Sequence, residues 1–317
     1  MPQEAAAIVG TGLVGQAWAI AFARAGWEVR LWDQVPEAPG EAIATTAGLL
    51  GDLADQGLLG GQKVAAVQGR LRPAPTLADA LAGATWMQES APERVELKRE
   101  LWAGIDEEAP AETILASSTS AIVPSRFTEG LPGRHRCLVT HLLNPPYLIP
   151  AIELVPAPWT SAETMRRAAE IMRGIGQAPI VMQREADGFV MNRLQGALLE
   201  EAFRLVADGI CSAEDVDIGL RDGLALRWSF MGPFETIDLN APGGVRDYVQ
   251  RYQQIYEGIF PSMQRRVDWA GPIIEAVERD RRARVPETAL AERQRWRDRR
   301  LMALLRHKRQ AAQEIGE

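Results

Sequence analysis

The chain is poor in the residues that build disulfide scaffolds, metal sites and membrane anchors. Among its 317 residues there are two cysteines and three histidines. Cys137 and Cys211 are too few for a disulfide framework and are not spaced as metal ligands, so we expect a reducing cytoplasm and no metal site. The N-terminus has no basic stretch before an apolar run, and no run of about 18 apolar residues occurs, so neither a signal peptide nor a transmembrane helix is expected.

The chain also lacks the excess of positive charge that nucleic acids and anionic membranes attract. Its formal net charge is −7, and charged residues make up 24 % of it. The exception is the segment 293–309, in which eight residues are Arg or Lys. Leu301, Leu304 and Leu305 give this segment an apolar stripe at helical spacing. We therefore interpret it as a helix docked on its own domain or on a second subunit, and expect neither nucleic acid nor membrane as a partner.

What the sequence does contain is an alternation of strand and helix signals. An apolar run at Ala5–Val9, a helix over 13–25 closed by Gly26 and a strand over 27–32 form a βαβ unit, which is typical of parallel sheets. Further strands are expected at 85–88, 113–116, 137–140, 152–155 and 180–182, with helices at 92–105 and 162–172. Strand signals then almost vanish, and a long helix is expected over 188–207. The pattern predicts an α/β Rossmann-type domain over residues 1–184 and an all-α domain over 185–317.

A glycine-rich segment joins the first predicted strand to the first predicted helix. Its pattern is G-x-G-x-x-G, and the residues expected to contact a dinucleotide are Gly10, Gly12, Leu13, Val14 and Gly15. Glycines here permit a tight turn and let the backbone approach a pyrophosphate, which the helix N-terminus attracts. Asp33, at the end of the second strand, can accept hydrogen bonds from the adenosine ribose and would repel a 2′-phosphate. A glycine-rich turn alone can be purely structural, but together with Asp33 it predicts NAD rather than NADP.

One of the three histidines is expected where a ligand could reach it. His135 lies in a polar connection and His307 in the basic C-terminal helix. His141 ends an apolar strand, and ligands of open α/β sheets bind at the carboxyl ends of the strands, where a histidine suits proton transfer. Glu153, an acid inside an apolar strand, could face His141, fix its tautomer and stabilise its protonated form. The alternatives are a buried structural histidine and an edge-strand acid that points to solvent.

Longer motifs surround these residues and extend into the second predicted domain. They include Gln88-Glu89, Pro92-Glu93-Arg94-Val95-Glu96-Leu97-Lys98, Ser117-Ser118-Thr119-Ser120, His141-Leu142-Leu143-Asn144-Pro145-Pro146-Tyr147, Gly188-Phe189-Val190-Met191-Asn192-Arg193, Gly232-Pro233-Phe234-Glu235-Thr236 and Trp296-Arg297-Asp298. On these motifs the chain resembles the 3-hydroxyacyl-CoA dehydrogenase superfamily over nearly its whole length. The Asn-Pro-Pro-Tyr segment and the C-terminal Trp-Arg-Asp point to its lambda-crystallin branch, whose known activity is the 3-dehydrogenation of L-gulonate.

The resemblance implies roles for individual residues. His141 would be the general base, and Glu153 would be its partner. Ser120 and Asn192 would hydrogen-bond the reacting oxygen of a small hydroxy-acid substrate. The resemblance also implies a helical domain of the 6-phosphogluconate dehydrogenase C-terminal-like type, a homodimer and an active site between the two domains.

The same resemblance assigns three more charged residues. Glu93 and Lys98 would line the cofactor and the region between the domains, and Arg193 would pair with Glu93. Glu93 and Lys98 therefore join the glycine-rich segment and Asp33 as expected cofactor-binding residues.

The chain departs from the acyl-CoA members of the superfamily in two places. Ser118 stands where they usually carry Asn, and the stretch 36–75 is short and poor in lysine, although a CoA site normally offers basic groups. This favours a small free acid, with Arg227 and Arg246 as candidates for its carboxylate. A 3-hydroxyacyl-CoA dehydrogenase, an L-carnitine dehydrogenase with an aromatic box near Trp228, and a non-catalytic crystallin-like protein remain as alternatives.

Overall fold

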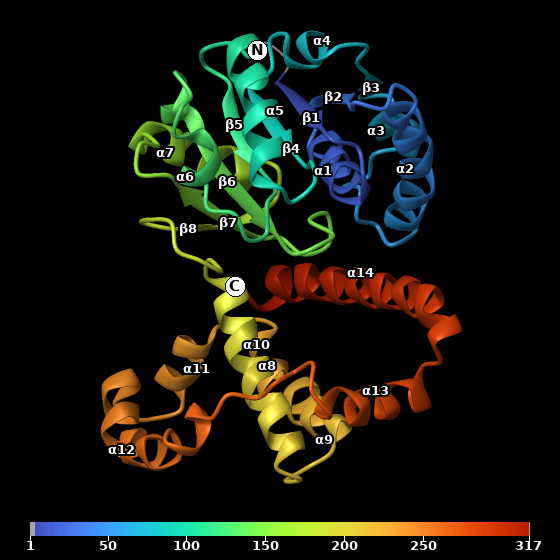
Figure 1. Ribbon diagram of the computed structural model, residues 1–317. Helices are drawn as coiled ribbons and strands as arrows, with labels where there is room; N and C mark the ends of the chain where they lie inside the picture. The colour runs from blue at the N-terminus through green and yellow to red at the C-terminus, as the bar shows by residue number, and fades with distance from the viewer. Residues whose placement is uncertain (1–3, 317) are drawn as a thin grey trace. The chain divides into compact units, whose positions relative to one another are not determined.

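The computed structural model describes residues 4–316, and the chain divides into two compact units (Figure 1). The first unit comprises Met1–Met191 together with Asp298–Glu317, and the second comprises Asn192–Arg297. The domain boundary expected after residue 184 stays a prediction. The division by contacts differs from it mainly at the C-terminus, because the end of the chain belongs to the first unit.

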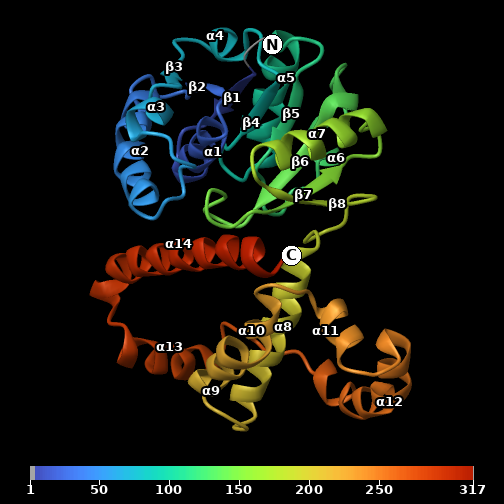
Figure 2. The ribbon, with the colours of Figure 1, turned by 180° about the vertical axis from the view of Figure 1, so that it is seen from behind.

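The first unit is built on one eight-stranded sheet with the order β3-β2-β1-β4-β5-β6-β7-β8 (Figure 2). The strands are β1 (Ala5–Val9), β2 (Glu28–Trp32), β3 (Leu71–Pro73), β4 (Trp86–Glu89), β5 (Ile114–Ser117), β6 (Cys137–Leu142), β7 (Ala151–Pro156) and β8 (Ala178–Val181). Only the β6–β7 pair is antiparallel. This mostly parallel sheet confirms the α/β Rossmann-type prediction. The strand β3 was not expected, since three residues that end in a proline give no period-two pattern.

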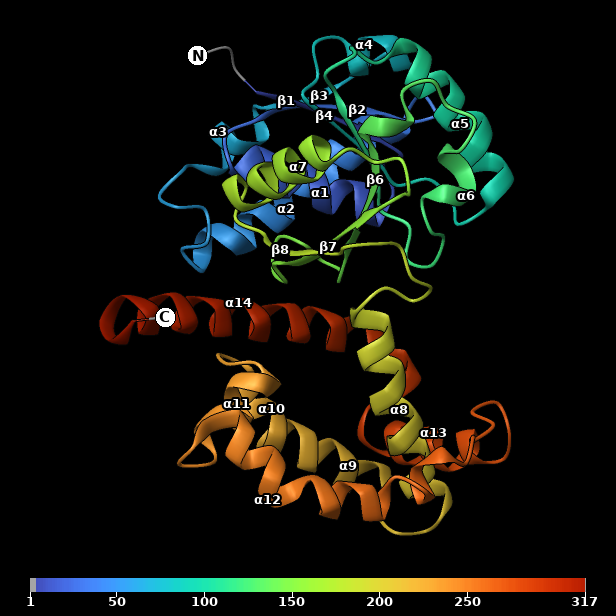
Figure 3. The same cartoon turned by 90° about the vertical axis from the view of Figure 1, so that its left-hand side faces the viewer.

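Helices cover both faces of this sheet (Figure 3). One face carries α1 (Leu13–Arg24), α2 (Ala38–Asp55), α3 (Val64–Gln68) and α7 (Ala162–Gly174); the other carries α4 (Leu77–Leu81), α5 (Val95–Glu108) and α6 (Ser125–Thr128). In β1, Ala6 and Ile8 pack into the first core, whereas Ala7 and Val9 pack into the second. A strand covered on both sides is apolar throughout rather than alternating, which explains the continuous run in the sequence.

The second unit is helical, as predicted. It contains α8 (Met191–Ala207), α9 (Ala213–Ile218), α10 (Ala225–Trp228), α11 (Pro233–Leu239), α12 (Gly244–Ile259) and α13 (Ile273–Arg284), with a π-helical turn at Gly219–Leu224 and 3₁₀ turns at Ser262–Gln264 and Glu287–Ala289. The start of α9 is a capping box, in which the side chains of Ser212 and Asp215 each accept a backbone N–H of the other. Pro233 begins α11, since proline needs no N–H in a first helical turn.

The basic C-terminal segment forms the helix α14 (Leu290–Ile315). Met302 is 2 % exposed, and Leu301 and Leu305 pack beside it against the first core of the sheet unit. Leu304 is 43 % exposed. The apolar stripe of this helix is therefore partly covered by the chain itself, and the covering unit is the first one. Within residues 4–316, no helix combines the length and the hydrophobicity needed to cross a bilayer.

Candidate active site

The glycine-rich turn between β1 and α1 is shaped to admit a phosphate group. Gly10 has a φ of +91°, and a Cβ atom there would lie 2.8 Å from the carbonyl oxygen of Ser90. A Cβ atom on Gly15 would lie 2.0 Å from the carbonyl oxygen of Gly10, so both positions require glycine. At Gly12 a Cβ atom would meet nothing within 4 Å. The backbone of Gly12 therefore faces open space before the first turn of α1, where a pyrophosphate fits.

Asp33 is anchored to this turn. Its Oδ2 atom accepts hydrogen bonds from the backbone N–H of Thr11 at 2.7 Å and from the Thr11 hydroxyl at 3.1 Å. Its Oδ1 atom accepts the backbone N–H of Val35 at 3.1 Å. Asp33 follows β2 directly and is half-buried. Its negative charge thus stands beside the phosphate turn, where it suits a ribose hydroxyl and disfavours a phosphate ester.

His141 and Glu153 face each other across the antiparallel strands β6 and β7. They are directly paired in the register of the two strands, so their side chains share one face of the sheet. His141 Nδ1 lies 2.5 Å from Glu153 Oε2, and the two side chains are 3 % and 0 % exposed. Because an ionised carboxylate can only accept, we assign the Nδ1 proton to the histidine. This leaves Nε2 as the ring nitrogen that Glu153 does not engage.

The second oxygen of Glu153 holds the chain that leads into α8. Its Oε1 atom accepts the backbone N–H groups of Val190 at 2.5 Å and Met191 at 2.8 Å. Phe189, with a φ of +50° and 1 % exposure, packs its ring 5.3 Å from that of His141. The helix expected over 188–207 therefore begins three residues later, at Met191. The carboxylate caps its first turn, and the left-handed backbone at Phe189 ends the preceding loop.

The surroundings of Glu153 keep it ionised. Burial raises the pKa of its carboxyl, but the hydrogen bond from His141 and those from the backbone N–H groups of Met191 and Val190 lower it. The net result is a pKa below the ordinary value of 4.5. Glu153 is thus a buried carboxylate whose two oxygens each have a defined donor.

This lowered pKa predicts how stability depends on pH. A carboxyl whose pKa is lower in the folded than in the unfolded chain stabilises the fold above the unfolded value of 4.5, and this contribution is lost as the pH falls through the lowered folded value. We expect the difference in free energy of unfolding between the wild type and Glu153→Gln to shrink on acidification below about pH 4.5. Urea unfolding at a series of pH values measures it. A difference that grows on acidification would contradict the assignment.

Two side chains, one at the end of α1 and one in the connection between α7 and β8, hold the loop that follows His141. It contains a cis peptide bond at Asn144–Pro145. Arg24, at the end of α1, donates from Nη1 to the carbonyl oxygen of Tyr147 at 2.9 Å, and Gln177 Nε2 donates to that of Pro146 at 3.2 Å. Burial and, to a smaller extent, the charge of Arg309 in α14 lower the pKa of Arg24 to about 10. The loop next to His141 is therefore held by fixed elements.

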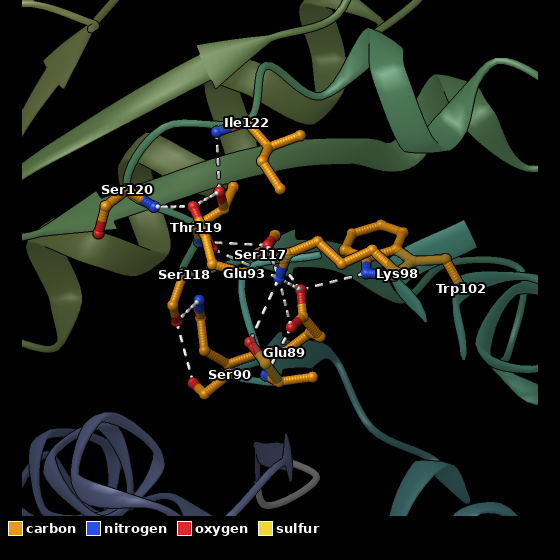
Figure 4. A network of polar contacts seen from close by, with 12 residues as sticks. Glu89, Ser90, Glu93, Lys98, Trp102, Ser117, Ser118, Thr119, Ser120 and Ile122 are labelled. Carbon is orange, nitrogen blue, oxygen red and sulfur yellow. Dashed lines mark hydrogen bonds and ion pairs between the residues drawn. The ribbon is translucent and has the colours of Figure 1, made fainter. Parts of the chain in front are cut away.

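Ser120 and Glu93 meet at the carboxyl ends of β4 and β5 (Figure 4). Ser120 is exposed at the end of the turn after β5. Glu93 Oε1 accepts the backbone N–H groups of Ser120 and Ala121, both at 3.0 Å, and a short hydrogen bond from the hydroxyl of Thr119. Glu93 thus shapes the turn that presents Ser120. Its predicted contact with the cofactor stays a prediction.

Lys98 lies deeper than expected for a residue that lines a cofactor. It is 0 % exposed, and its Nζ atom donates to Glu89 Oε1 at 2.8 Å and Oε2 at 2.9 Å. The distance from Lys98 Nζ to Glu93 Oε2 is 4.0 Å. Glu89 was not chosen from the sequence as a site residue. A lysine at an inward position of α5 needs a buried acid, and this requirement was the signal that could have found it.

Ser118, which stands where the acyl-CoA members usually carry Asn, makes hydrogen bonds on the face of the sheet that α1 covers. Its Oγ atom lies 3.0 Å from Trp18 Nε1, 2.8 Å from Gln88 Nε2 and 3.0 Å from Ser90 Oγ. Trp18 belongs to α1, the helix that follows the glycine-rich turn. Ser118 therefore links the turn after β5 to the cofactor helix.

The remaining expected residues belong to the helical unit or to its start. Asn192 is the second residue of α8 and opens the second unit, and Arg193 follows it. The role of Asn192 and the pairing of Arg193 with Glu93 stay predictions. The other two histidines match their expected settings, since His135 is exposed in a 3₁₀ turn at Arg134–Arg136 and His307 is exposed in α14.

Comparisons with known proteins agree with this architecture. Residues 5–186 match the family model "3-hydroxyacyl-CoA dehydrogenase, NAD binding domain", and residues 188–271 match "3-hydroxyacyl-CoA dehydrogenase, C-terminal domain". A lambda-crystallin homolog of Bos taurus is 40 % identical over 310 residues, which are 97 % of this chain and 96 % of that protein. An L-carnitine dehydrogenase of a Pseudomonas species is 35 % identical over 305 residues, covering 94 % of this chain and 92 % of that protein.

A solved structure extends the likeness to three dimensions. The crystal structure of 5-formyl-3-hydroxy-2-methylpyridine 4-carboxylic acid 5-dehydrogenase, an NAD⁺-dependent dismutase, aligns with a TM-score of 0.80 at 28 % identity, covering 96 % of this chain and 98 % of that one. The glycine-rich turn with its open face and the anchored Asp33 fit the dinucleotide that this family binds. The chain therefore belongs to the 3-hydroxyacyl-CoA dehydrogenase family and is an NAD-dependent dehydrogenase that acts on a hydroxyl group.

Proposed function

We propose that this dehydrogenase oxidises the 3-hydroxyl group of a small free 3-hydroxy acid, and that L-gulonate, giving 3-dehydro-L-gulonate, is its substrate. The observation that carries the chemistry is the buried His141–Glu153 pair at the end of β6, with Nδ1 and Oε2 2.5 Å apart. The choice of L-gulonate is supported by 40 % identity to a lambda-crystallin homolog and by the activity that the sequence resemblance implies for that branch.

In this proposal His141 moves the hydroxyl proton. Glu153 holds the ring by Nδ1, so Nε2 is the nitrogen that accepts the proton from the substrate, and the fixed negative charge of Glu153 stabilises the imidazolium that forms. Bound NAD⁺ supplies the hydride acceptor. Ser120 and Asn192 would donate hydrogen bonds to the reacting oxygen and so hold the carbinol in place.

The helix α2 favours a free acid over a CoA thioester. In the sequence of α2, over Ala38–Asp55, there are three acids and no Lys or Arg. A helix of that charge, directly after β2, offers nothing to the phosphates of CoA. L-carnitine is the second candidate, because it is also a free 3-hydroxy acid and a dehydrogenase for it is 35 % identical to this chain. Trp228, which is 39 % exposed on α10, could bind a cationic substrate group through a cation–π contact.

The test compares three substrates at matched concentrations. Reduction of NAD⁺ by the purified protein is followed with L-gulonate, L-carnitine and 3-hydroxybutyryl-CoA. We expect the highest kcat/KM for L-gulonate. A higher kcat/KM for L-carnitine would show that L-carnitine, and not L-gulonate, is the substrate, while the substrate would still be a free 3-hydroxy acid. Turnover of the thioester alone would overturn the proposal.

Asp33 should set the choice of dinucleotide. We expect Asp33→Ala to raise the Kd of NADH at least about 10-fold, because a charged group that accepts from a ribose hydroxyl is worth about 1.5–3 kcal/mol. The Kd of NADPH should rise less or fall, since the repulsion of its 2′-phosphate is removed. Titration of cofactor fluorescence measures both constants. Asp52→Ala, an exposed acid of α2, is the matched control and should change neither.

The predicted homodimer is also part of this proposal. None of the residues of α12 is buried, and its exposed apolar side chains are Val245, Val249, Tyr252, Ile255, Tyr256 and Ile259. We expect this face to pack on a second copy, and Ile255→Asp to halve the mass measured by light scattering. Gln253→Asp on the same helix is the control and should leave the mass unchanged.

The two free cysteines suit the reducing cytoplasm that we propose as the compartment of this protein.

A further inference from the structure

Beneath Ser120 lies a buried ion pair that the proposed chemistry does not use. Glu89, the last residue of β4, and Lys98, on α5, are both 0 % exposed. Glu89 Oε1 accepts from Lys98 Nζ at 2.8 Å and from the backbone N–H of Ala91 at 2.6 Å. Glu89 Oε2 accepts from Lys98 Nζ at 2.9 Å, from the Ser117 hydroxyl at 2.6 Å and from Trp102 Nε1 at 3.2 Å. One carboxylate therefore joins Ala91, in the turn after β4, to Ser117, the last residue of the neighbouring strand β5.

The hydrogen bonds continue from this pair to Ser120 without a break (Figure 4). Ser117 Oγ accepts the backbone N–H of Thr119 at 3.2 Å, and the Thr119 hydroxyl donates to Glu93 Oε1. That same oxygen accepts the backbone N–H of Ser120 at 3.0 Å. The Thr119 hydroxyl also accepts the backbone N–H of Ile122 at 3.0 Å, which closes the far side of the turn.

Lys98 connects the two acids of this chain of contacts. Its ammonium donates to Glu89 and stands 4.0 Å from Glu93 Oε2. Glu93 is 43 % exposed, and its carboxylate accepts from the Thr119 hydroxyl and from the N–H groups of Ser120 and Ala121. With Lys98 in place, the acid that accepts the Ser120 N–H is attracted toward the buried end of the network.

We propose that Lys98, Glu89 and Thr119 are positioning residues that set the place of the Ser120 hydroxyl through the backbone of its turn. The inference rests on the proposed role of Ser120 in binding the reacting oxygen. A buried ion pair contributes little net stability compared with an apolar pair of similar size, because both charges lose their hydration. Fixed geometry is what such a pair can add, and a displacement of about 1 Å at a reacting group can cost about 100-fold in rate.

A double-mutant cycle separates positioning from plain stability. Thr119→Val keeps the shape of a residue that is 2 % exposed and removes its bonds to Glu93 and Ile122. In the wild-type background we expect kcat to fall about 30-fold, with the Kd of NADH unchanged. In the Ser120→Ala background the same change should lower kcat less than about 3-fold, because no hydroxyl remains to be placed. The assay uses NAD⁺ and whichever of the three candidate substrates is turned over.

Two results would overturn the inference. One is an equal loss of kcat in both backgrounds, which means that Thr119 acts on stability or on another residue. The other is an unchanged kcat for Thr119→Val. If Ser120→Ala alone has full activity, the proposed role of Ser120 fails first and the positioning role with it, so the two failures are seen in different variants.

A charge-neutral pair tests the buried end of the network. Glu89→Gln combined with Lys98→Met removes both charges. The Gln carbonyl can still accept from Ser117 and Trp102, whereas its amide nitrogen replaces the oxygen that accepts the Ala91 N–H, so that one bond is lost. We expect this double variant to unfold at a urea concentration only slightly below that of the wild type and to show kcat lowered at least about 10-fold. A folded double variant with the kcat of the wild type would show that Lys98 and Glu89 do not position Ser120.

Discussion

Replacing His141 by Gln should lower kcat about 1000-fold, within the range of about 10²–10⁴ that general acid–base catalysis contributes. Gln can accept a hydrogen bond at the same place but cannot take up a proton at neutral pH. The Kd of NADH should stay within about 2-fold, because His141 lies at the end of β6 and the phosphate turn lies between β1 and α1. Steady-state turnover and NADH fluorescence titration give the two quantities.

The chain supplies a matched control for this variant. His135 is exposed in the turn before β6, so His135→Gln makes the same chemical change six residues away and should leave kcat unchanged. The kcat of Glu153→Gln should lie between those of His141→Gln and His135→Gln. The ring of His141 keeps a partner at Nδ1 but loses the fixed negative charge that stabilises the imidazolium. Full activity of His141→Gln would show that another group takes the hydroxyl proton.

Replacing Lys98 by Met should cost about 3–5 kcal/mol of unfolding free energy, the largest loss of stability that we expect from a single substitution outside the apolar core. The reason is the partner that remains: Glu89 is 0 % exposed, and without Lys98 its charge stays buried with only neutral donors around it. Urea unfolding followed by circular dichroism measures the change.

Two further variants serve as controls for this prediction: the same substitution at an exposed lysine, and a double variant in which the buried pair has no charge. Lys63→Met removes a lysine that is exposed at the start of α3 and should change the unfolding free energy by less than about 0.5 kcal/mol. Adding Glu89→Gln to Lys98→Met should restore most of the lost stability, because no uncompensated charge remains. If the single variant is as stable as the wild type, the contact between Lys98 and Glu89 does not hold this part of the fold together.

Glu153 connects the proposed chemistry to the chain path. One of its oxygens orients His141, and the other accepts the first amides of α8, the helix on which Asn192 is the second residue. A single carboxylate therefore fixes the ring of His141, the proposed base, and the point at which α8 begins. This double duty explains why an acid stands inside an otherwise apolar strand, which was the anomaly visible in the sequence.

The local patterns were sufficient for much of the fold and part of the site. The G-x-G-x-x-G turn, the apolar run before it and Asp33 after the second strand predict a dinucleotide domain from short-range features alone, because each step depends on neighbouring residues. The same holds for His141 and Glu153. Each was identified as a polar residue in a buried strand, and only a short connection separates the two strands, so their pairing needed little more than an antiparallel turn.

Tertiary structure decided the rest, because the contacts involved join distant residues through burial rather than periodicity. The resemblance implied that Lys98 would line the cofactor and the region between the domains, and only the packing of α5 on the sheet showed that Glu89 is its partner. The first turn of α8 is set by Glu153, 38 residues before Met191, and not by helix propensity. The end of α14 packs on the first unit through Met302, although its pattern predicted only that some surface would cover it. A sequence states which side chains need a partner, and only the folded chain determines which partner each one finds.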